Sequence, residues 1–254
     1  MQTFPYALKP ADPPRLGLIV LQTDERIEPD FRRLLPEDAG LFASRVPSGL
    51  DVTPATLQAM HDHIPAAAAL LPQARGFDVV GYGCTSGSAQ IGPEVVAEQV
   101  RKGVRTGAVT EPVSALAAAC SALGIRRVAF LSPYVETVSD RLRAVLAGRG
   151  IESPVFGTFA EAEEARVSRI DPASTCDAAL TLLRAGGVDG LFLSCTNLDT
   201  LDIVAGLERE TGLPVLSSNL VLGWHMARLA GLGQGALLRA TRLGRACPTA
   251  PARV

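Results

Sequence analysis

The sequence predicts an α/β fold of two pseudo-symmetric, doubly wound parallel-sheet halves with the active site between them. Three observations support this prediction. Short apolar runs alternate with helical patterns along the chain, as in parallel sheets that helices cover on both faces. The length of 254 residues suits one large domain or two small ones. A segment of the first half also recurs in the second.

The individual elements follow from composition and periodicity. Five short, nearly continuous apolar runs are typical of buried strands, at residues 16–21, 78–83, 127–132, 189–194 and 214–217. Seven segments have helical patterns, several of them opened by proline, at residues 54–71, 93–102, 113–123, 135–149, 172–185, 201–211 and 220–230. Residues 247–254 are expected to be disordered.

An internal repeat organises these elements. Residues 76–85 align without a gap on residues 187–196, an offset of 111 (195 minus 84) that places Cys84 on Cys195. The same offset carries 16–21 onto 127–132 and 103–106 onto 214–217, which indicates a duplication. Residues 1–112 with 218–254 then form the first half, and residues 113–217 form the second. Because ligands bind beyond the carboxyl ends of parallel strands, we expect both thiols in one shared cleft.

Composition excludes several classes of protein. A hydrophobic content of 47%, a charged content of 20% and a net charge of -2 argue against disorder. The 24 basic and 26 acidic residues form no basic run, so no nucleic-acid partner is expected. No apolar stretch reaches the roughly 20 residues of a membrane span, and no signal-peptide pattern opens the chain, which predicts a cytoplasmic protein without a membrane partner. Five cysteines, an odd number, predict free thiols.

No cofactor or metal is expected. Residues 81–87 resemble a dinucleotide-binding loop, but the third glycine comes one position late and the equivalent segment of the second half has none. Lys9 and Lys102 are poorly placed for a pyridoxal phosphate Schiff base. His61 and His63, two residues apart on a predicted helix, point to different faces and make a poor metal site.

Cys84 and Cys195 are the candidate catalytic residues. Each stands at a strand-to-helix turn, where backbone N–H groups favour a thiolate. Buried packing is the alternative for either thiol alone. Hydroxyl and amide residues that can bind a carboxylate follow each cysteine: Thr85 and Ser86 after the first, Thr196 and Asn197 after the second. Two thiols on opposite sides of such a cleft suit nucleophilic attack or proton transfer at carbon.

Several motifs resemble the aspartate/glutamate racemase superfamily and, within it, the maleate cis-trans isomerase and arylmalonate decarboxylase branch. They include Ser-Pro-Tyr at 132–134, Ser-Cys-Thr-Asn-Leu at 194–198 and Leu-Pro-Val-Leu-Ser-Ser-Asn at 213–219. The resemblance covers nearly the whole chain. It implies two similar α/β halves with one cysteine each and no cofactor.

The resemblance also implies roles for individual residues. In maleate isomerases the cysteine matched by Cys84 adds to the double bond to give a succinyl thioether, and the one matched by Cys195 acts as acid and base. Tyr134 matches a tyrosine that helps to hold a substrate carboxylate. Arylmalonate decarboxylases have glycine at the first cysteine position, so Cys84 favours a cofactor-independent isomerase of small carboxylic acids. A homodimer is compatible with such a fold.

Two acidic residues depart from the isomerase pattern. Asp24 and Glu164 stand where the isomerases carry asparagine, and an ionised carboxylate repels a substrate carboxylate that an amide would bind. Either the loop alignment is shifted or one end of the substrate is cationic. A cationic end fits a second resemblance, of residues 83–87 and 191–198 to racemase-like proteins of bacterial ectoine-utilisation clusters. Racemisation of an amino acid or ectoine-like compound, decarboxylation and carboxylate binding without catalysis remain the alternatives.

Overall fold

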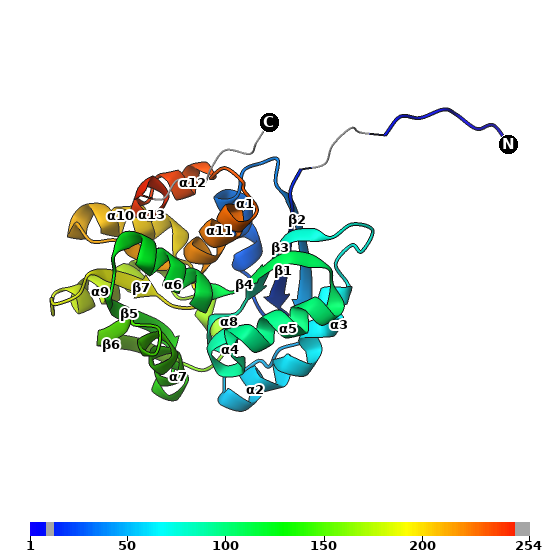
Figure 1. Ribbon diagram of the computed structural model, residues 1–254. Coiled ribbons are helices and arrows are strands. Elements are labelled where there is room, and N and C mark those ends of the chain that lie inside the picture. Colours follow the sequence, from blue (N-terminus) through cyan, green and yellow to red (C-terminus); the bar gives the residue numbers. More distant parts are fainter. Residues whose placement is uncertain (9–12, 247–254) are drawn as a thin grey trace.

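Two four-stranded parallel sheets form the framework of the molecule (Figure 1). The computed structural model describes residues 1–8 and 13–246, so the predicted disordered tail at 247–254 lies outside the described residues. The strand orders are β2-β1-β3-β4 and β6-β5-β7-β8, the same order in both halves of the chain. The predicted α/β architecture of two similar parallel-sheet halves is confirmed.

The first sheet contains β1 (Arg15–Leu21), β2 (Gly40–Val46), β3 (Phe77–Gly83) and β4 (Thr106–Thr110). Its two faces follow from the alternation of side chains along β1. Leu16 and Leu18 belong to a core cluster shared with α1 (Ile27–Leu34) and α11 (Ser218–Leu229). Ile19 and Leu21 belong to a second cluster, shared with α3 (Ile64–Ala69) and α5 (Pro93–Gly103). The sheet is thus covered by helices on both faces.

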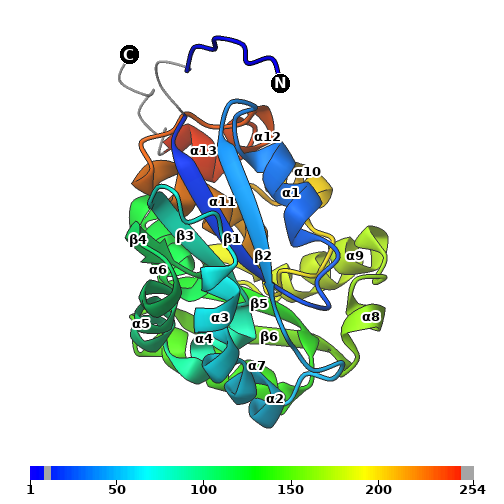
Figure 2. The ribbon, with the colours of Figure 1, turned by 90° about the vertical axis from the view of Figure 1, so that its right-hand side faces the viewer.

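The second sheet repeats this plan with β5 (Arg127–Tyr134), β6 (Glu152–Glu161), β7 (Gly190–Leu193) and β8 (Val215–Ser217). The helices α7 (Glu136–Ala147), α9 (Pro172–Leu183) and α10 (Leu201–Thr211) pack against it. Between the halves, α6 (Pro112–Leu123) packs on α11. Figure 1 shows the two sheets side by side, and in the turned view of Figure 2 the first sheet lies in front, with α11 beside it. The predicted boundaries at residues 112 and 217 remain a prediction.

The remaining helices are short: α2 (Pro54–Ala59), α4 (Thr85–Ile91), α8 (Glu164–Val167), α12 (Ala236–Arg239) and α13 (Arg242–Ala246). The expected single helix at 54–71 is wrong, since α2, a 3-10 turn at Met60–His63 and α3 replace it. Pro65 in the first turn of α3 explains the break, because proline lacks an N–H and restricts the residue before it. Among the described residues, no helix is both long and apolar enough to cross a bilayer.

The repeat offset of 111 holds for the central strands and drifts at the edge. It relates β1 to β5 and β3 to β7. The repeat predicted that residues 103–106 are the equivalent of β8. In the structure α5 continues through Gly103, and the equivalent strand β4 begins only at Thr106. This part of the predicted correspondence is therefore wrong by two or more residues.

Candidate active site

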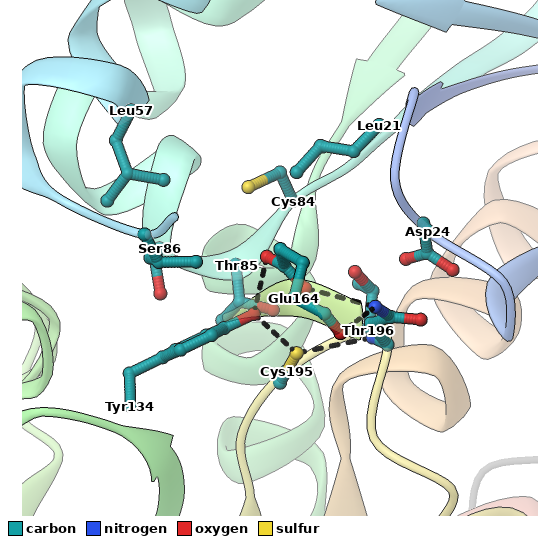
Figure 3. Close-up of a pocket in the computed structure, with 12 residues that line it drawn as sticks. Leu21, Asp24, Leu57, Cys84, Thr85, Ser86, Tyr134, Glu164, Cys195 and Thr196 are labelled. Atoms are coloured by element: carbon teal, nitrogen blue, oxygen red, sulfur yellow. Dashed lines mark hydrogen bonds between the residues drawn. The ribbon is translucent and has the colours of Figure 1, made fainter. Parts of the chain in front are cut away.

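A small pocket lies where the two sheets meet (Figure 3). All nine residues proposed from the sequence line it: Asp24, Cys84, Thr85, Ser86, Tyr134, Glu164, Cys195, Thr196 and Asn197. Leu21, Val52 and Leu57 complete the lining. Both halves contribute residues to the pocket.

Cys84 follows β3 and caps the N-terminus of α4. Its Sγ accepts a hydrogen bond from the Gly87 N–H at 3.2 Å. A Cβ on Gly87 would lie 2.8 Å from this sulfur, so glycine is what permits the approach. Burial nevertheless raises the pKa of the Cys84 thiol to about 12, although the Gly87 N–H favours the thiolate. The Gly87 N–H thus favours the thiolate, as expected for this turn, but loss of hydration has the larger effect on the pKa.

Cys195 follows β7 in a conformation that side chains rarely adopt, with φ of 108°. Its N–H donates to Ser218 Oγ at 3.0 Å, and the same oxygen accepts from Thr85 Oγ1 at 2.8 Å. Ser218 thereby joins a site residue of one half to a site residue of the other. The sequence analysis did not single out Ser218, although its position directly after a predicted strand was a usable signal.

Tyr134 connects Cys195 to Glu164. The Tyr134 hydroxyl donates to Glu164 Oε1 at 2.8 Å and lies 2.9 Å from Cys195 Sγ. Because the hydroxyl has one proton, the Cys195 thiol donates to the tyrosine oxygen when Glu164 is ionised. Asn197 donates its N–H to Cys195 Sγ at 3.2 Å and its Nδ2 to Glu164 Oε2 at 3.0 Å. The four groups form a continuous hydrogen-bonded chain.

The pocket is acidic. Burial raises the pKa of Glu164, and the charge of Asp24 adds to this, while hydrogen bonds from Asn197 and Tyr134 oppose it. Burial, and then repulsion by Glu164, raises the pKa of Cys195 well above its usual value. Within the described residues no group of three or more histidine, cysteine or acidic side chains could hold a metal ion. The raised pKa values of Cys84 and Cys195 favour the protonated form of both thiols at neutral pH.

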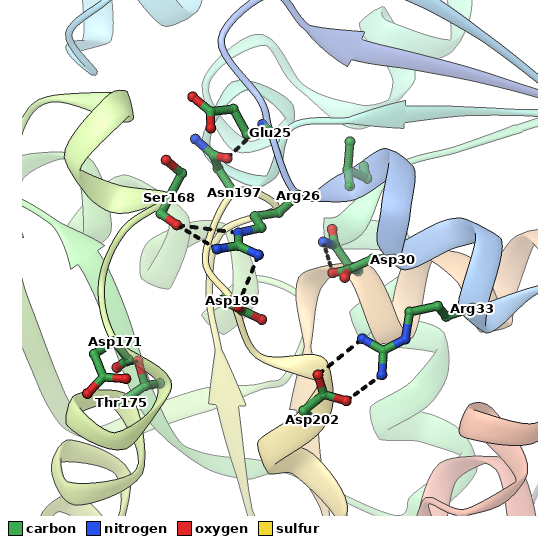
Figure 4. Close-up of polar contacts among 12 residues, drawn as sticks. Glu25, Arg26, Asp30, Arg33, Ser168, Asp171, Thr175, Asn197, Asp199 and Asp202 are labelled. Carbon is green, nitrogen blue, oxygen red and sulfur yellow. Dashed lines mark hydrogen bonds and ion pairs between the residues drawn. The ribbon is translucent and has the colours of Figure 1, made fainter.

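The loop after β1 reaches across to the second half (Figure 4). Asp24 Oδ1 accepts from the N–H groups of Arg26 and Ile27, both at 2.8 Å, and so begins α1. The Arg26 guanidinium donates to the Ser168 carbonyl oxygen and pairs with Asp199 at 3.1 Å. These contacts hold Asp24 at the pocket. Arg26 is a second residue that the sequence analysis missed.

Comparisons with known proteins agree with this geometry. The family model described as arylmalonate decarboxylase matches residues 16–242. Arylmalonate decarboxylase of Bordetella bronchiseptica is 32% identical, covering 89% of this chain and 94% of the relative. The crystal structure of the maleate isomerase Iso from Pseudomonas putida S16 superposes with a TM-score of 0.80 at 25% identity, over 89% of this chain and 98% of that one.

A further structure is chemically informative. It is a cysteine-to-serine variant of Nocardia farcinica maleate cis-trans isomerase with a covalently bound succinylcysteine intermediate, with a TM-score of 0.75 and 25% identity over 89% of this chain and 98% of that one. The family model covers most of the chain, and the paired α/β halves agree with it. The chain therefore belongs to the arylmalonate decarboxylase and maleate isomerase family, in the Asp/Glu racemase-like superfamily.

Proposed function

We propose that the protein is a cofactor-independent isomerase of small carboxylic acids in which Cys84 and Cys195 make and break bonds at a substrate carbon. The observation that carries the proposal is the presence of two buried thiols, one from each half, in a single pocket. A decarboxylation that needs one proton donor does not call for a second thiol. Isomerisation does, because bond formation and proton transfer occur at adjacent carbons or opposite faces.

The addition route can be written so that atoms balance. Cys84 first loses its proton to solvent water, which gives the reactive state with Cys84 as thiolate and Cys195 as thiol. Cys84 Sγ bonds to one alkene carbon as the π bond breaks, and the Cys195 proton moves to the neighbouring carbon. Rotation about the new single bond follows, then Cys195 removes a proton, the C–S bond breaks and the double bond returns in the trans form. The succinylcysteine of the Nocardia isomerase is the adduct that such a step forms from maleate.

Tyr134 and Glu164 provide a route for the Cys195 proton. When the thiol gives its proton to the Tyr134 oxygen, the hydroxyl proton passes to Glu164 Oε1, which leaves a thiolate, a neutral tyrosine and a neutral carboxylic acid. The raised pKa of Glu164 favours its role as proton acceptor. The Asn197 N–H stabilises the resulting sulfur charge.

Ser86 is the hydroxyl best able to bind a substrate carboxylate. Thr85 donates its hydroxyl proton to Ser218, and Thr196 donates to the Gly83 carbonyl oxygen. Ser86 lines the pocket and, in the part of the chain that the structure describes, its hydroxyl has no hydrogen-bond partner. We therefore assign direct carboxylate contact to Ser86, and we assign a supporting role in the pocket wall to the two threonines.

Proton NMR in D2O with the reduced enzyme tests the proposal. The panel contains maleate, aspartate, glutamate, ectoine and phenylmalonate. Fumarate from maleate would establish addition and rotation, and deuterium at a Cα–H of a recovered amino acid or ectoine would establish isomerisation by proton transfer at two thiols. Either result supports the proposal.

Decarboxylation is the second candidate, favoured by the 32% identity to arylmalonate decarboxylase. In the same panel it would appear as phenylacetate formed from phenylmalonate, with deuterium at its α-carbon. Phenylacetate without any product or exchange from the other compounds would reject the isomerase proposal.

A further inference from the structure

Asp24 carries a buried carboxylate oxygen that the protein itself does not satisfy. The residue is 3% exposed and lines the pocket beside Thr196 (Figure 3). Oδ1 accepts two backbone N–H groups, whereas Oδ2 has no hydrogen-bond partner among the described residues. Burial raises the pKa of Asp24, whereas the backbone N–H groups and the Thr196 hydroxyl, which also donates to the Gly83 carbonyl oxygen, favour its ionised form. Buried polar atoms are normally paired, so an unpaired one in a pocket indicates a ligand group.

No cationic side chain pairs with this oxygen among the described residues of the pocket lining, although the charge of Arg45 favours the ionised form of Asp24. None of the described residues that line the pocket is lysine, arginine or histidine. Arg45 donates to the backbone oxygens of Leu21, Gln22 and Asp24 and pairs with Glu28, so its guanidinium is already engaged beneath the loop. Glu164 is the other acidic residue in the lining. A second carboxylate of a ligand would enter against two like charges.

We infer that the substrate is a zwitterion, with one carboxylate and a cationic nitrogen group, an ammonium or amidinium, that donates a hydrogen bond to Asp24 Oδ2. The inference rests on the proposed function, since it names the class of small carboxylic acid that the pocket takes. A cation at this position would pair with Asp24 and offset the repulsion that Glu164 exerts on both thiols. Such a charge-assisted hydrogen bond favours the zwitterion over a dicarboxylate of the same size.

A matched pair of ligands tests this inference. Maleate and cis-4-aminobut-2-enoate share a cis double bond conjugated to one carboxylate, and they differ in a second carboxylate against an ammonium group. Isothermal titration with the Cys84→Ala/Cys195→Ala variant measures binding without turnover. We expect the amino compound to bind at least about tenfold more tightly than maleate. Adding Asp24→Asn should weaken its binding about tenfold and leave maleate binding equal or stronger.

Glu25→Gln in the same background is the control, because it removes one negative charge from the same loop at an exposed side chain. It should leave the ratio of the two affinities unchanged. Tighter binding of maleate, together with its loss in Asp24→Asn, would show that Asp24 is a neutral donor to a second carboxylate and would overturn the inference. That outcome would leave the proposed function standing, since the NMR panel with the unmodified enzyme tests isomerisation separately.

Discussion

The Tyr134 hydroxyl is the single group that touches both a thiol and a carboxylate in the pocket network described above. Tyr134→Phe removes the hydroxyl link between Cys195 and Glu164, keeps the ring and leaves the contacts of Asn197 with both residues. We expect kcat to fall about 100-fold, as is typical for loss of a positioned proton-transfer group, with KM little changed. Steady-state kinetics across pH measures this. A uniform rise in KM at constant kcat would show instead that Tyr134 only binds substrate.

Ser218 supports the unusual backbone of Cys195. Ser218→Ala leaves the Cys195 N–H and the Thr85 hydroxyl without their acceptor, so we expect a loss of about 1–3 kcal/mol in the free energy of unfolding. Urea denaturation provides the measurement. Ser121→Ala, at an exposed position of α6, should change stability by less than about 0.5 kcal/mol. Equal stability of the two variants would contradict the role given to Ser218.

Residues of the site differ in how far the sequence could reveal them. Cys84 and Cys195 were predictable because each ends a buried strand and the repeat equates them. The place of Ser218 directly after a predicted strand was a usable signal, but the contacts of Ser218 and Arg26 were not predictable. These contacts join residues 133 and 142 positions apart, and no local pattern specifies such a pairing. The raised pKa of each thiol could not be predicted from neighbouring residues in the sequence, because it depends on burial that only the assembled pocket creates.

At the scale of elements, the loop between β1 and α1 is held to the second half by Arg26. We expect Arg26→Ala to free this loop and raise KM about tenfold, since Asp24 is then no longer fixed at the pocket. Arg33→Ala is the matched control, because Arg33 also pairs with an aspartate of the second half, Asp202, but at exposed side chains. Steady-state kinetics and thermal midpoints are measured for both variants and compared. Identical effects would show that Arg26 acts only as a surface ion pair.

Elements were predictable where burial is complete. The central strands β1, β3, β5 and β7 are continuous apolar runs, which the sequence shows directly. The edge strands β2 and β6 alternate between partly buried and exposed positions, so they lack that signal and were not predicted. The prediction of a single helix at 54–71 was wrong because the apolar periodicity continues through Pro65, whereas the helical backbone hydrogen bonds do not.

At the scale of the whole molecule, Asp30 couples stability to pH. Burial raises the pKa of Asp30 from 3.8 to about 7, and Asp199 adds to this, although Asn219 donates to its Oδ2 at 2.7 Å. The folded state therefore binds the Asp30 proton more tightly than the unfolded state does, and this group lowers stability as pH rises from about 4 to about 7. Asp30→Asn keeps an acceptor for Asn219 and removes the charge.

We accordingly expect Asp30→Asn to raise the thermal midpoint at pH 8 and to change it little at pH 4.5, where the unmodified residue is protonated. Differential scanning calorimetry across this range measures the effect. A midpoint that falls equally at both pH values would show that Asp30 stabilises the fold as an ionised hydrogen-bond acceptor.

The central claim is that the duplicated halves each deliver one working thiol to a common pocket. The most direct measurement is the rate of product formation or deuterium exchange by NMR for Cys84→Ala, Cys195→Ala and the control Cys176→Ser, whose half-buried thiol lies on α9 outside the pocket. The account predicts that each of the first two variants loses turnover by at least about a thousandfold while its circular dichroism is unchanged, and that the control keeps full activity. Full activity in either pocket variant would contradict two-cysteine chemistry.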